Sequence, residues 1–591
     1  MKAEFSDNQE KATQAFGEDQ KYKLTRLVCW AVCIGFALIE AWSQRQFINE
    51  DGISYLDMSD WLLRHNWHLL VNPVWSPLYP ILIGVVTWFM RPSGLWEVPL
   101  VHVLNLVIFL VALASFEFLL RRLIRVFRQE STQEGAGSAA PLPVWTWQLL
   151  AYSLFAWSTF GMIWAPRMLT PDLCVAIFVY LDAGLLLGLH ASTKRSRTCL
   201  LLGLTLGLGY LAKAVLFPMA FVFMVVAFFV IGEWRRAVRP LTITFLVFCA
   251  ISAPLFISIS KRVGRPSYGE AGNLNYAWHV NHVTAGKVAG HSFFPSASGP
   301  PPYLKRPMTL LHKRPDAYGF REPVAFSYPP RDDMEYWDAG TKAVLNPRNQ
   351  LRAISKNLIV LFRDAHILPM SGLIVAGLLL LLIGPNVPRR FENIVGSWPL
   401  LILGVAVPCV YLLVNVEPRY VAPFLVLVLL GLLPGILLQN PESDAKRVTL
   451  ATVVIAISLM VFTGTLVVYH LAGFPRGELS HGEFVQIGTS LNRAGVLPGE
   501  DVALIGDGSD GCRWARLARV RIVAQILRED VDDFWRLSDP RAKAEVYDGF
   551  ARFGAKAVVA EQTPPSLDLA DWQRLGDTYC YVHLLALPRG K

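Results

Sequence analysis

Long apolar segments alternate with short basic clusters over most of the chain. A transmembrane helix needs about 20 apolar residues to cross about 30 Å of hydrocarbon, and this criterion predicts eleven spans. They fall near residues 24–44, 98–120, 144–164, 171–190, 199–212, 216–232, 240–258, 367–384, 397–414, 421–438 and 448–470. The pattern therefore predicts a polytopic all-α membrane protein.

One further apolar stretch, residues 73–90, is better explained as a helix lying on the outer membrane surface. If it were a span, the basic cluster at 121–128 would lie outside the cytoplasm, and every later basic cluster would also change sides. As a surface helix it lets all the clusters obey the positive-inside rule. These clusters are residues 121–128, 193–197, 233–239, 388–390 and 444–447. We therefore expect a cytoplasmic N-terminus and a C-terminus on the outer side.

This topology predicts three domains. They are a cytoplasmic N-terminal tail (1–23), a transmembrane catalytic domain (24–470) with outer loops at 45–97 and 259–366, and an outer C-terminal α/β domain (471–591). Alternating apolar runs predict the strands of the last domain at 501–508, 518–527, 555–562 and 579–587. Its helices are predicted at 483–495 and 540–553. Outside the cytoplasm, Cys512 and Cys580 are expected to form a disulfide.

Composition agrees with the membrane assignment. The 591 residues are 53% hydrophobic and 17% charged, with a mean hydropathy of +0.38, whereas soluble domains average about 45–50% apolar and about 25% charged residues. The formal net charge of +9 raises the question of a nucleic-acid partner. Because most of the basic residues sit beside apolar segments, we predict no nucleic-acid partner.

A glycine-rich turn in the C-terminal domain resembles a dinucleotide fingerprint. Gly506, Gly508 and Gly511 satisfy GxGxxG after a predicted strand. Asp507 and Asp510, however, would put negative charge where a pyrophosphate must sit. We interpret the motif as a tight turn from strand to helix.

The first outer loop carries a cluster of acids, Glu50, Asp51, Asp57 and Asp60. Ser54 and Asp57 match a capping box, which predicts a helix from Ser54 to about residue 65. Asp57 and Asp60 then interact with the helix N-terminus. Asp51 precedes the cap and is the candidate general base, with Glu50 as its competitor and a solvated loop acid as the alternative.

Two other outer turns carry ions between apolar segments. Residues 167–174 supply Arg167 and Asp172, where Asp172 could instead serve only as a first-turn acid of the following helix. Lys213 stands in an otherwise apolar turn, and a lysine that snorkels to the membrane surface is the ordinary explanation.

A third outer turn, residues 415–423, places Glu417, Arg419 and Tyr420 at the end of a helical hairpin. Arg419, like Lys213, defies the positive-inside bias, and an unpaired cation near lipid is costly. A local ion pair between Glu417 and Arg419 is the simple alternative.

Taken together, these outer turns offer the parts that a lipid-linked phosphate ester requires. Cations can bind the leaving phosphate, and a carboxylate can accept the proton of an acceptor hydroxyl. Aromatic side chains can bind the sugar, and the substrate-binding candidates are Tyr55, Tyr276, His279 and Tyr420. His279 and His282 lack nearby partners of metal-ligand type, so we predict no metal site and no cofactor, and a divalent metal is not indicated.

Five motifs in order resemble a known family. They are the acidic motif after the first span, WSPLYPILIG before the second, RMLTPD at the start of the fourth, GLGYLAK in the fifth and VEPRY before the tenth. This order is similar to that of the GT-C membrane glycosyltransferases, particularly the bacterial branch related to protein O-mannosyltransferases and the lipid A aminoarabinose transferase. The likeness covers roughly residues 24–440.

The resemblance implies a polyprenyl-phosphate-sugar donor, a periplasmic active site and inversion at the anomeric carbon. It gives the base role to Asp51 and a second-carboxylate role to Asp172, and it puts Lys213 and Arg419, with Arg167, near the donor phosphate. It also implies a bacterial inner-membrane location and no metal for a monophosphate donor. The Glu50-Asp51 order departs from the Asp-Glu pair of the family, so the assignment of the two acids stays open. The loop 259–366 and the tail are not general to the family and do not identify the acceptor, which could be a glycan, a lipid or a protein.

A transporter or flippase of a lipid-linked saccharide is the rival hypothesis. It would need no base, but it should have polar groups running through the spans. Few such groups occur, mainly Asp182 and Glu117, and both lie toward the predicted cytoplasmic ends of their spans. A non-catalytic scaffold would explain neither Lys213 nor the long loop. The enzyme hypothesis requires Asp51, Asp172, Lys213 and Arg419 to meet at one cavity.

Overall fold

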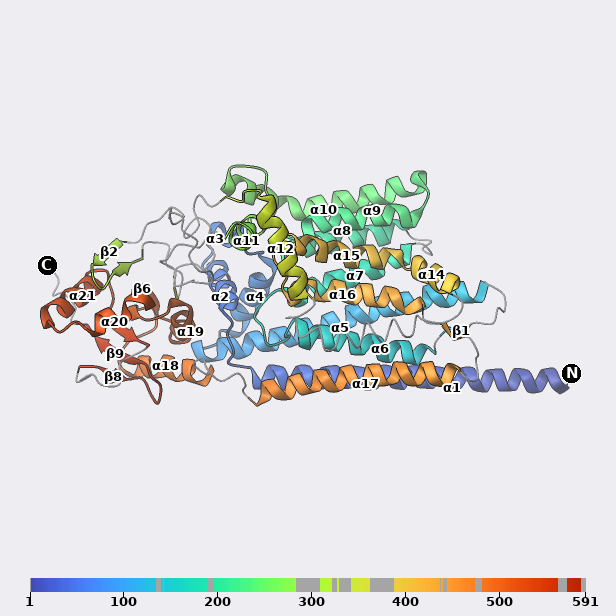
Figure 1. Cartoon of the computed structure of the whole chain (residues 1–591), viewed down its shortest axis with the longest axis horizontal. Coiled ribbons are helices and arrows are strands. Elements are labelled where there is room, and N and C mark those ends of the chain that lie inside the picture. The colour runs from blue at the N-terminus through green and yellow to red at the C-terminus, as the bar shows by residue number, and fades with distance from the viewer. Residues whose placement is uncertain are drawn as a thin grey trace.

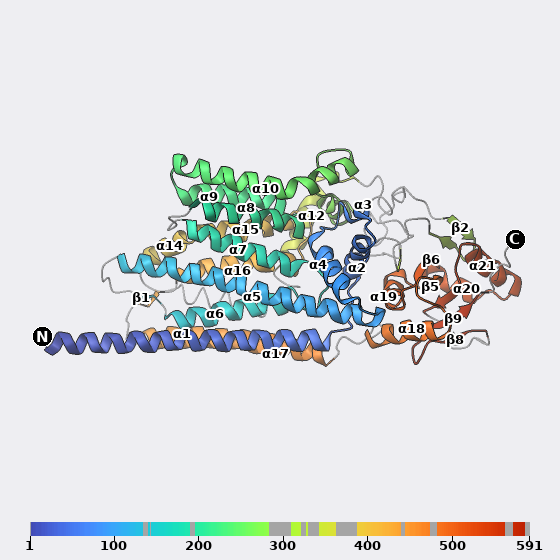
Figure 2. The same ribbon diagram turned by 180° about the vertical axis from the view of Figure 1, so that it is seen from behind.

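The structure is a computed structural model of the 591-residue chain. It describes residues 2–133, 140–141, 143–189, 195–282, 309–320, 327–328, 342–361, 387–435, 437–438, 444–472, 481–561 and 571–585. The helices form an elongated bundle with their axes roughly parallel, and the C-terminal domain lies beyond one end of it (Figure 1). Seen from behind, the N-terminus lies at the opposite end of the bundle from that domain (Figure 2).

Ten helices make up the bundle, one at each predicted span on described residues. They are α1 (Lys2–Ser43), α5 (Gly94–Gln133), α6 (Val144–Ala156), α7 (Asp172–Leu189), α8 (Arg195–Ala212), α9 (Leu216–Ile231), α10 (Trp234–Val263), α15 (Trp398–Leu412), α16 (Pro418–Leu432) and α17 (Asp444–Leu471). A π-helical turn, Trp157–Met162, extends α6. The predicted span at 367–384 lies outside the described residues.

Among the described residues, six helices are long and apolar enough to cross a membrane. The qualifying segments are Asp19–Ser43, Gly94–Phe127, Asp172–Leu189, Trp234–Val263, Pro418–Gly435 and Val448–Leu471. The helices α9 and α15 are apolar but shorter. The mostly helical membrane fold is therefore confirmed, whereas the count of eleven spans stays a prediction.

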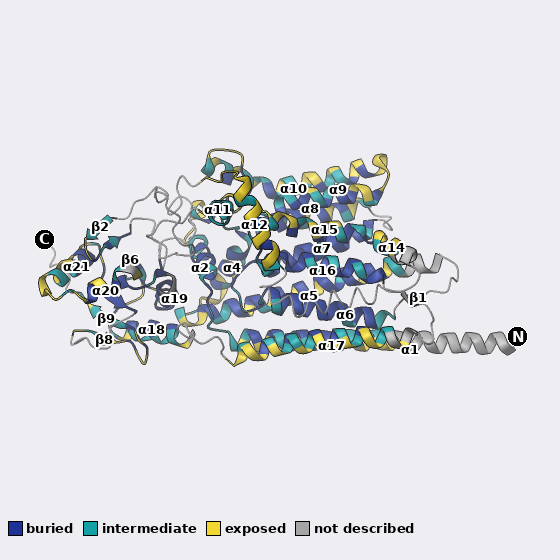
Figure 3. Ribbon diagram, in the orientation of Figure 1, coloured by how far each residue is buried: buried dark blue, intermediate teal, exposed yellow. Residues whose placement is uncertain are grey.

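The outward face of α17 is suited to lipid. Leu450, Val454, Ile457, Val461 and Val468 are all exposed, and they recur at spacings of three, four and seven residues, which puts them on one side of the helix. Exposed residues follow the outer side of α17 along its length (Figure 3). An exposed apolar stripe of this length on a helix of 28 residues is typical of contact with hydrocarbon.

Close packing holds the centre of the bundle together. An aromatic group from α5, α6, the π-helical turn and α7 is fully buried, and it consists of Phe109, Phe116, Phe155, Phe160 and Tyr180. Gly184 of α7 lets that helix approach α5, because a Cβ there would lie 2.6 Å from the ring of Phe118. Since lipid tails are as apolar as these side chains, van der Waals packing rather than water exclusion stabilises the contact.

Short helices cover the end of the bundle nearest the C-terminal domain (Figure 1). They are α2 (Glu50–Leu63), α3 (Trp67–Leu70), α4 (Leu78–Met90), α11 (Ala271–His279) and α12 (Pro347–Ile359). The 13 residues of α4 span about 20 Å, too short for a bilayer. This length agrees with the predicted surface helix at 73–90.

The opposite end of the bundle carries α14 (Val387–Gly396) and a two-stranded sheet. In that sheet, β1 (Ala140–Pro141) pairs with β4 (Leu437–Leu438) in antiparallel register. The connection between α9 and α10 also lies at this end (Figure 1), and so does the basic cluster 233–239, which covers the start of α10.

The predicted capping box in the first outer loop is wrong. Helix α2 begins at Glu50 with Asn49 as its N-cap residue, so Ser54 lies buried inside the helix. The Asn49 side chain accepts a hydrogen bond from the backbone N–H of Leu169 at 2.8 Å. The helix therefore starts four residues upstream of Ser54, and the side chain at its N-cap position contacts a distant segment instead of capping the helix.

The C-terminal domain contains the predicted α/β arrangement. Its strands are β5 (Asp501–Ile505), β6 (Arg521–Ile526), β7 (Ala557–Ala560), β8 (Gln573–Arg574) and β9 (Tyr581–Leu584), and its helices are α18 (His481–Arg493), α19 (Gly508–Ala518), α20 (Val531–Trp535) and α21 (Pro540–Arg552). The central strand β5 runs parallel to both β6 and β7. Cys512 and Cys580 are both buried in this domain, and the disulfide between them stays a prediction.

Two strands of this sheet come from the long loop 259–366, which the sequence pattern did not predict. They are β2 (Thr309–His312) and β3 (Ala317–Gly319), and β3 pairs with β6 in antiparallel register. The sheet order is therefore β2-β3-β6-β5-β7-β9-β8. The loop joins the membrane part of the chain to the C-terminal domain.

The glycine-rich turn is a strand-to-helix connection, as predicted. Gly506, at the end of β5, has a φ of +152°, and a Cβ there would lie 2.5 Å from the Glu561 carboxylate. That carboxylate accepts hydrogen bonds from the backbone N–H of Asp507 at 2.8 Å and from the Trp514 indole at 2.9 Å. A protein carboxylate thus occupies the position where a dinucleotide would put its pyrophosphate.

Candidate active site

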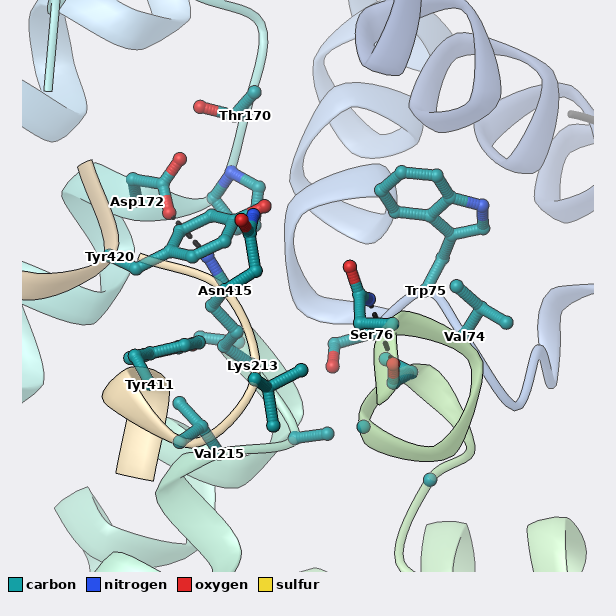
Figure 4. Close-up of a pocket in the computed structure, with 18 of the residues that line it drawn as sticks. Val74, Trp75, Ser76, Thr170, Asp172, Lys213, Val215, Tyr411, Asn415 and Tyr420 are labelled. Atoms are coloured by element: carbon teal, nitrogen blue, oxygen red, sulfur yellow. Dashed lines mark hydrogen bonds and ion pairs between the residues drawn. The ribbon is translucent and has the colours of Figure 1, made fainter. Parts of the chain in front are cut away.

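A cavity of about 310 Å³ opens at the end of the bundle that faces the C-terminal domain. Its walls come from five segments that are far apart in the chain. They are α2 with residues 74–76, the start of α7 at 170–172, the turn at 212–218, residues 268–278, and the hairpin at 410–420. The first outer loop forms one wall through Val74, Trp75 and Ser76, and Asp172, Lys213, Tyr411 and Tyr420 form the other (Figure 4).

Four ionised side chains form a continuous network in this cavity. Arg419 Nη2 lies 2.8 Å from Asp51 Oδ2, and its Nη1 lies 3.8 Å from Asp172 Oδ2. Lys213 Nζ donates to Asp172 Oδ1 at 2.6 Å (Figure 4). The four residues expected to meet at one cavity therefore do so. Two carboxylates and two cations alternate, so their formal charges cancel.

The local structure explains how each cation reaches the cavity. Helix α8 ends at Ala212, and the backbone N–H of Lys213 bonds the carbonyl of Gly209 at 3.0 Å, so Lys213 projects from the last turn. Helix α16 begins at Pro418, the favoured first helical residue. Arg419 therefore lies in the first turn and bonds Asp51, rather than Glu417 as the local alternative would have it.

Aromatic rings hold the two cations. Lys213 Nζ lies 3.7 Å from the centre of the Tyr420 ring, and Arg419 Cζ lies 5.1 Å from it. Burial lowers the pKa of Lys213, while the nearby Asp172 carboxylate opposes that shift. Such cation–π contacts strengthen as water is excluded. The snorkelling explanation therefore fails for Lys213, which points into the bundle.

Asp51 and Glu50 are adjacent but face different partners. Asp51 lines the cavity and its side chain is 24% exposed. Glu50 is not among the cavity-lining residues, and its Oε1 lies 3.4 Å from Nη2 of Arg513 in the C-terminal domain. Of the two first-turn acids of α2, Asp51 is the one that a molecule in the cavity could reach.

The start of α2 is tightly packed against the segment before α7. A Cβ on Gly52 would lie 2.8 Å from the Cβ of Leu169 and 3.1 Å from Asn49 Oδ1. The absence of a side chain at Gly52 therefore allows the helix to approach closely enough for Asp51 to meet Arg419.

Two of the four aromatic substrate-binding candidates line the cavity. Tyr55 and Tyr420 do so, and burial with Asp51 nearby raises the pKa of Tyr55 well above its usual value, which keeps the hydroxyl neutral. Tyr276 instead donates to Gln350 Oε1 at 2.7 Å. Burial lowers the pKa of His279 to about 4.

Four predicted site residues thus lie outside the cavity wall, namely Glu50, Arg167, Tyr276 and His279. The guanidinium carbon of Arg167 lies 4.7 Å from the ring centre of Phe47. Its side chain belongs to the contact between the first outer loop and the segment before α7.

Several cavity residues were missed from the sequence. They are chiefly uncharged polar and aromatic side chains: Trp75, Ser76, Tyr268, Asn275, Trp278, Tyr411 and Asn415. Asn72 Oδ1 accepts the backbone N–H groups of Val74 and Trp75 at 2.7 and 3.1 Å, which fixes the turn that presents Trp75. Residue type alone does not predict that an aromatic residue lines a cavity, because aromatic residues are common wherever a helix meets the membrane surface.

The described part of the chain contains no group of three or more His, Cys, Asp or Glu side chains placed to hold a metal ion. The acids nearest the cavity, Asp51 and Asp172, are each paired with a cation. The chemistry that this arrangement can perform directly is proton acceptance by a carboxylate and binding of an anion by Lys213 and Arg419.

No family model matches the sequence, and no curated protein matches it. Among solved structures, apo ArnT from Cupriavidus metallidurans aligns with a TM-score of 0.50 and 14% identity over 96% of this chain and 98% of ArnT. ArnT bound to undecaprenyl phosphate gives 0.49 and 12% over 96% and 99%. An Archaeoglobus fulgidus oligosaccharyltransferase in complex with Zn and sulfate gives 0.48 and 12% over 90% and 68%. The end-to-end alignment with apo ArnT means that this chain shares the fold of ArnT, in agreement with the GT-C fold that its five motifs predicted.

Proposed function

We propose that this protein is a GT-C-type membrane glycosyltransferase that moves a sugar from a polyprenyl-phosphate donor to an acceptor hydroxyl on the periplasmic side. The observation that carries the proposal is the alternating network of Asp51, Arg419, Asp172 and Lys213 in one cavity. A carboxylate within reach of solvent stands beside two partly buried cations, as transfer from a phosphate ester requires.

In the proposed reaction, Asp51 accepts the proton of the acceptor hydroxyl while the oxygen of that hydroxyl attacks the anomeric carbon of the donor sugar. The bond between that carbon and the phosphate oxygen breaks, and the electron pair leaves with the polyprenyl phosphate. Lys213 and Arg419 stabilise the negative charge that develops on the leaving phosphate. A single displacement of this kind inverts the anomeric configuration.

Arg419 connects donor binding to the base. Its Nη2 lies 2.8 Å from Asp51 Oδ2, and a donor phosphate would compete for the same guanidinium. Binding of the phosphate would weaken the ion pair between Arg419 and Asp51 and leave that carboxylate free to accept a proton. Asp172 keeps its contact with Lys213 at 2.6 Å and so acts as the counter-ion that holds the lysine in place.

The rest of the cavity suits a sugar. Its volume of about 310 Å³ is at the lower end of the range for small-molecule sites. Tyr55, Trp75 and Tyr420 offer ring faces and edges, and Tyr55 packs edge-on against Trp75 with ring centres 5.1 Å apart. Ser76 and Asn415 add hydrogen-bonding groups for sugar hydroxyls.

The location of the cavity supports a lipid-linked donor. It lies at the end of the bundle opposite the N-terminus and the basic segment 233–239 (Figure 1), and the positive-inside rule supports a position on the periplasmic side of the inner membrane. A donor carried in the membrane could enter there. The acceptor is a hydroxyl of a glycan, a lipid or a protein.

A transporter or flippase is less well supported. The polar residues inside the spans are engaged within the bundle, since Asp182 accepts a hydrogen bond from Thr205 and Glu117 pairs with Arg121. These contacts tie neighbouring residues of the bundle together rather than line a polar path. A flippase would also have no use for the reachable carboxylate of Asp51.

The test uses purified protein with a panel of radiolabelled polyprenyl-phosphate sugars and a total membrane extract as the acceptor. We expect one donor to label an acceptor fraction. Asp51→Asn should abolish transfer and leave donor binding largely intact, while Glu50→Gln should keep transfer. An active Asp51→Asn together with a dead Glu50→Gln would move the base role to Glu50. If no donor yields a labelled acceptor, but the protein carries a labelled lipid-linked saccharide across vesicle membranes, the proposal is wrong.

A further inference from the structure

One arginine of the C-terminal domain is buried against three acids of the membrane part. Arg516 of α19 is 4% exposed, and its Nε and Nη2 bind both carboxylate oxygens of Glu97 at 2.9 and 2.7 Å. Its Nη1 lies 2.9 Å from Asp57 and 2.5 Å from Asp60. Glu97 lies in the first turn of α5, so one guanidinium joins the C-terminal domain to two helices of the membrane part.

The backbones at this contact are also close. A Cβ on Gly94, at the start of α5, would lie 2.9 Å from the carbonyl oxygen of Leu517. Arg519 Nη2 donates to the carbonyl of Pro92 at 3.3 Å. The domain is therefore seated directly on the end of α5, and Arg516 fills the centre of the contact.

Helix α2 connects this contact to the cavity. Asp57 lies six residues after Asp51 on the same helix, about 9 Å along its axis. At 100° per residue, six residues turn the helix by about 240°, so Asp51 faces the cavity while Asp57 and Asp60 face the domain. A displacement of α19 would move the helix that carries Asp51.

A second arginine of α19 contacts the first turn of α2. Arg513 lies 3.4 Å from Glu50, the neighbour of Asp51, while Arg419 of the bundle holds Asp51 itself at 2.8 Å. The first turn of α2 is thus held by two ion pairs, one with Arg513 of the C-terminal domain and one with Arg419 of the bundle. The loop 259–366 makes a further connection, because residues 268–278 line the cavity and β3 of the same loop pairs with β6.

We propose that Arg516 is a positioning residue for the reaction: by seating the C-terminal domain on α2, it holds the Asp51 carboxylate where it meets Arg419 and the acceptor. This inference rests on the proposed function. Arg516 is not among the residues that line the cavity, so its effect on transfer is exerted through α2. The C-terminal domain is then part of the catalytic unit rather than a separate appendage.

The test compares Arg516→Met with Arg528→Gln. Arg528 is an arginine of the same domain that is 66% exposed and lies 3.6 Å from Asp507, away from α2. Misplacement of Asp51 by about 1 Å should lower kcat by about 100-fold, while the KM for the donor stays within about threefold because Lys213 and Arg419 remain. Arg528→Gln should transfer sugar at the wild-type rate.

A second readout does not depend on sugar transfer. Amide hydrogen exchange of a peptide covering residues 47–63 should accelerate by about tenfold in Arg516→Met, because α2 loses its anchor. If Arg516→Met does not fold, Glu97→Gln replaces it, because this substitution keeps the side-chain shape. It should lower kcat and accelerate exchange in α2 as well, but by smaller factors. A merely structural role would lower the yield of folded protein and leave kcat and α2 exchange of the folded fraction unchanged, and that result would overturn the proposal. If the wild-type protein transfers no sugar, the proposed function fails, while exchange in α2 still reports whether Arg516 anchors the helix.

Discussion

The pairing of Lys213 with Asp172 can separate a structural role from a catalytic one. Lys213→Met removes the ammonium that lies 2.6 Å from Asp172, a carboxylate that is only 2% exposed. The remaining counter-charge is Arg419, whose Nη1 is 3.8 Å away. Lys213→Met thus leaves a buried carboxylate short of one partner and removes a cation from the proposed phosphate site.

Two magnitudes follow. Removing one partner of a buried ion pair costs about 3–5 kcal/mol, and the residual contact with Arg419 should reduce this loss of unfolding free energy to about 2–3 kcal/mol. A hydrogen bond to a charged group contributes about 1.5–3 kcal/mol. Its loss in the transition state would slow transfer by a factor of about 10–150.

The double variant Lys213→Met with Asp172→Asn distinguishes the two effects. It removes both charges, so most of the lost stability should return, because no uncompensated buried charge remains. Transfer should stay low, because the phosphate still lacks its ammonium. Thermal unfolding of the solubilised protein measures the first quantity, and initial transfer rates under saturating acceptor measure the second. If the double variant regains transfer to within about threefold of wild type, Lys213 serves only as a counter-ion of Asp172, and the phosphate-binding role is refuted.

Two further predictions concern α2. Burial raises the pKa of Asp57 to about 8, and the nearby Asp60 and Glu97 carboxylates add to the shift while Arg516 opposes it. Between about pH 4 and pH 8 the folded protein therefore holds a proton on Asp57 that the unfolded chain releases. The free energy of unfolding should fall as the pH rises through that window. Asp57→Asn should flatten this decline in melting temperature, and an unaltered slope would contradict the assignment. Gly52→Ala would put a Cβ 2.8 Å from Leu169 and should lower kcat by about tenfold or more by displacing Asp51, whereas transfer at the wild-type rate would mean that α2 can shift without cost.

The four ionised residues of the cavity could be predicted because each stands out against its surroundings. Lys213 and Arg419 are cations at the ends of apolar segments on the side where the positive-inside rule disfavours them, and a charge near lipid requires a partner. That requirement holds wherever the partner lies in the sequence. The energetic cost of an isolated ion therefore predicts convergence without any knowledge of the packing.

The start of α2 shows the limit of local reasoning. The spacing of Ser54 and Asp57 satisfies a capping box, yet the helix begins after Asn49, whose side chain accepts a hydrogen bond from the backbone N–H of the distant Leu169. Asp51 therefore lies inside the first turn of α2 rather than before the cap, and it does line the cavity. The position of Asp51 after the first span, and not the predicted helix boundary, indicates its place at the cavity.

The contact made by Arg516 could not be predicted for the opposite reason. An arginine in a mixed-charge domain costs nothing when it is solvated, so the sequence gives no sign that Arg516 is buried. Asp57 and Glu97, for their part, look like ordinary acids in the first turns of helices. A charged residue in an apolar segment can be predicted to have a partner, because an isolated charge there is costly. A charged residue in a polar domain allows no such prediction, because water can solvate it. The residues that couple the C-terminal domain to Asp51 therefore become visible only when α2, α5 and α19 are seen together.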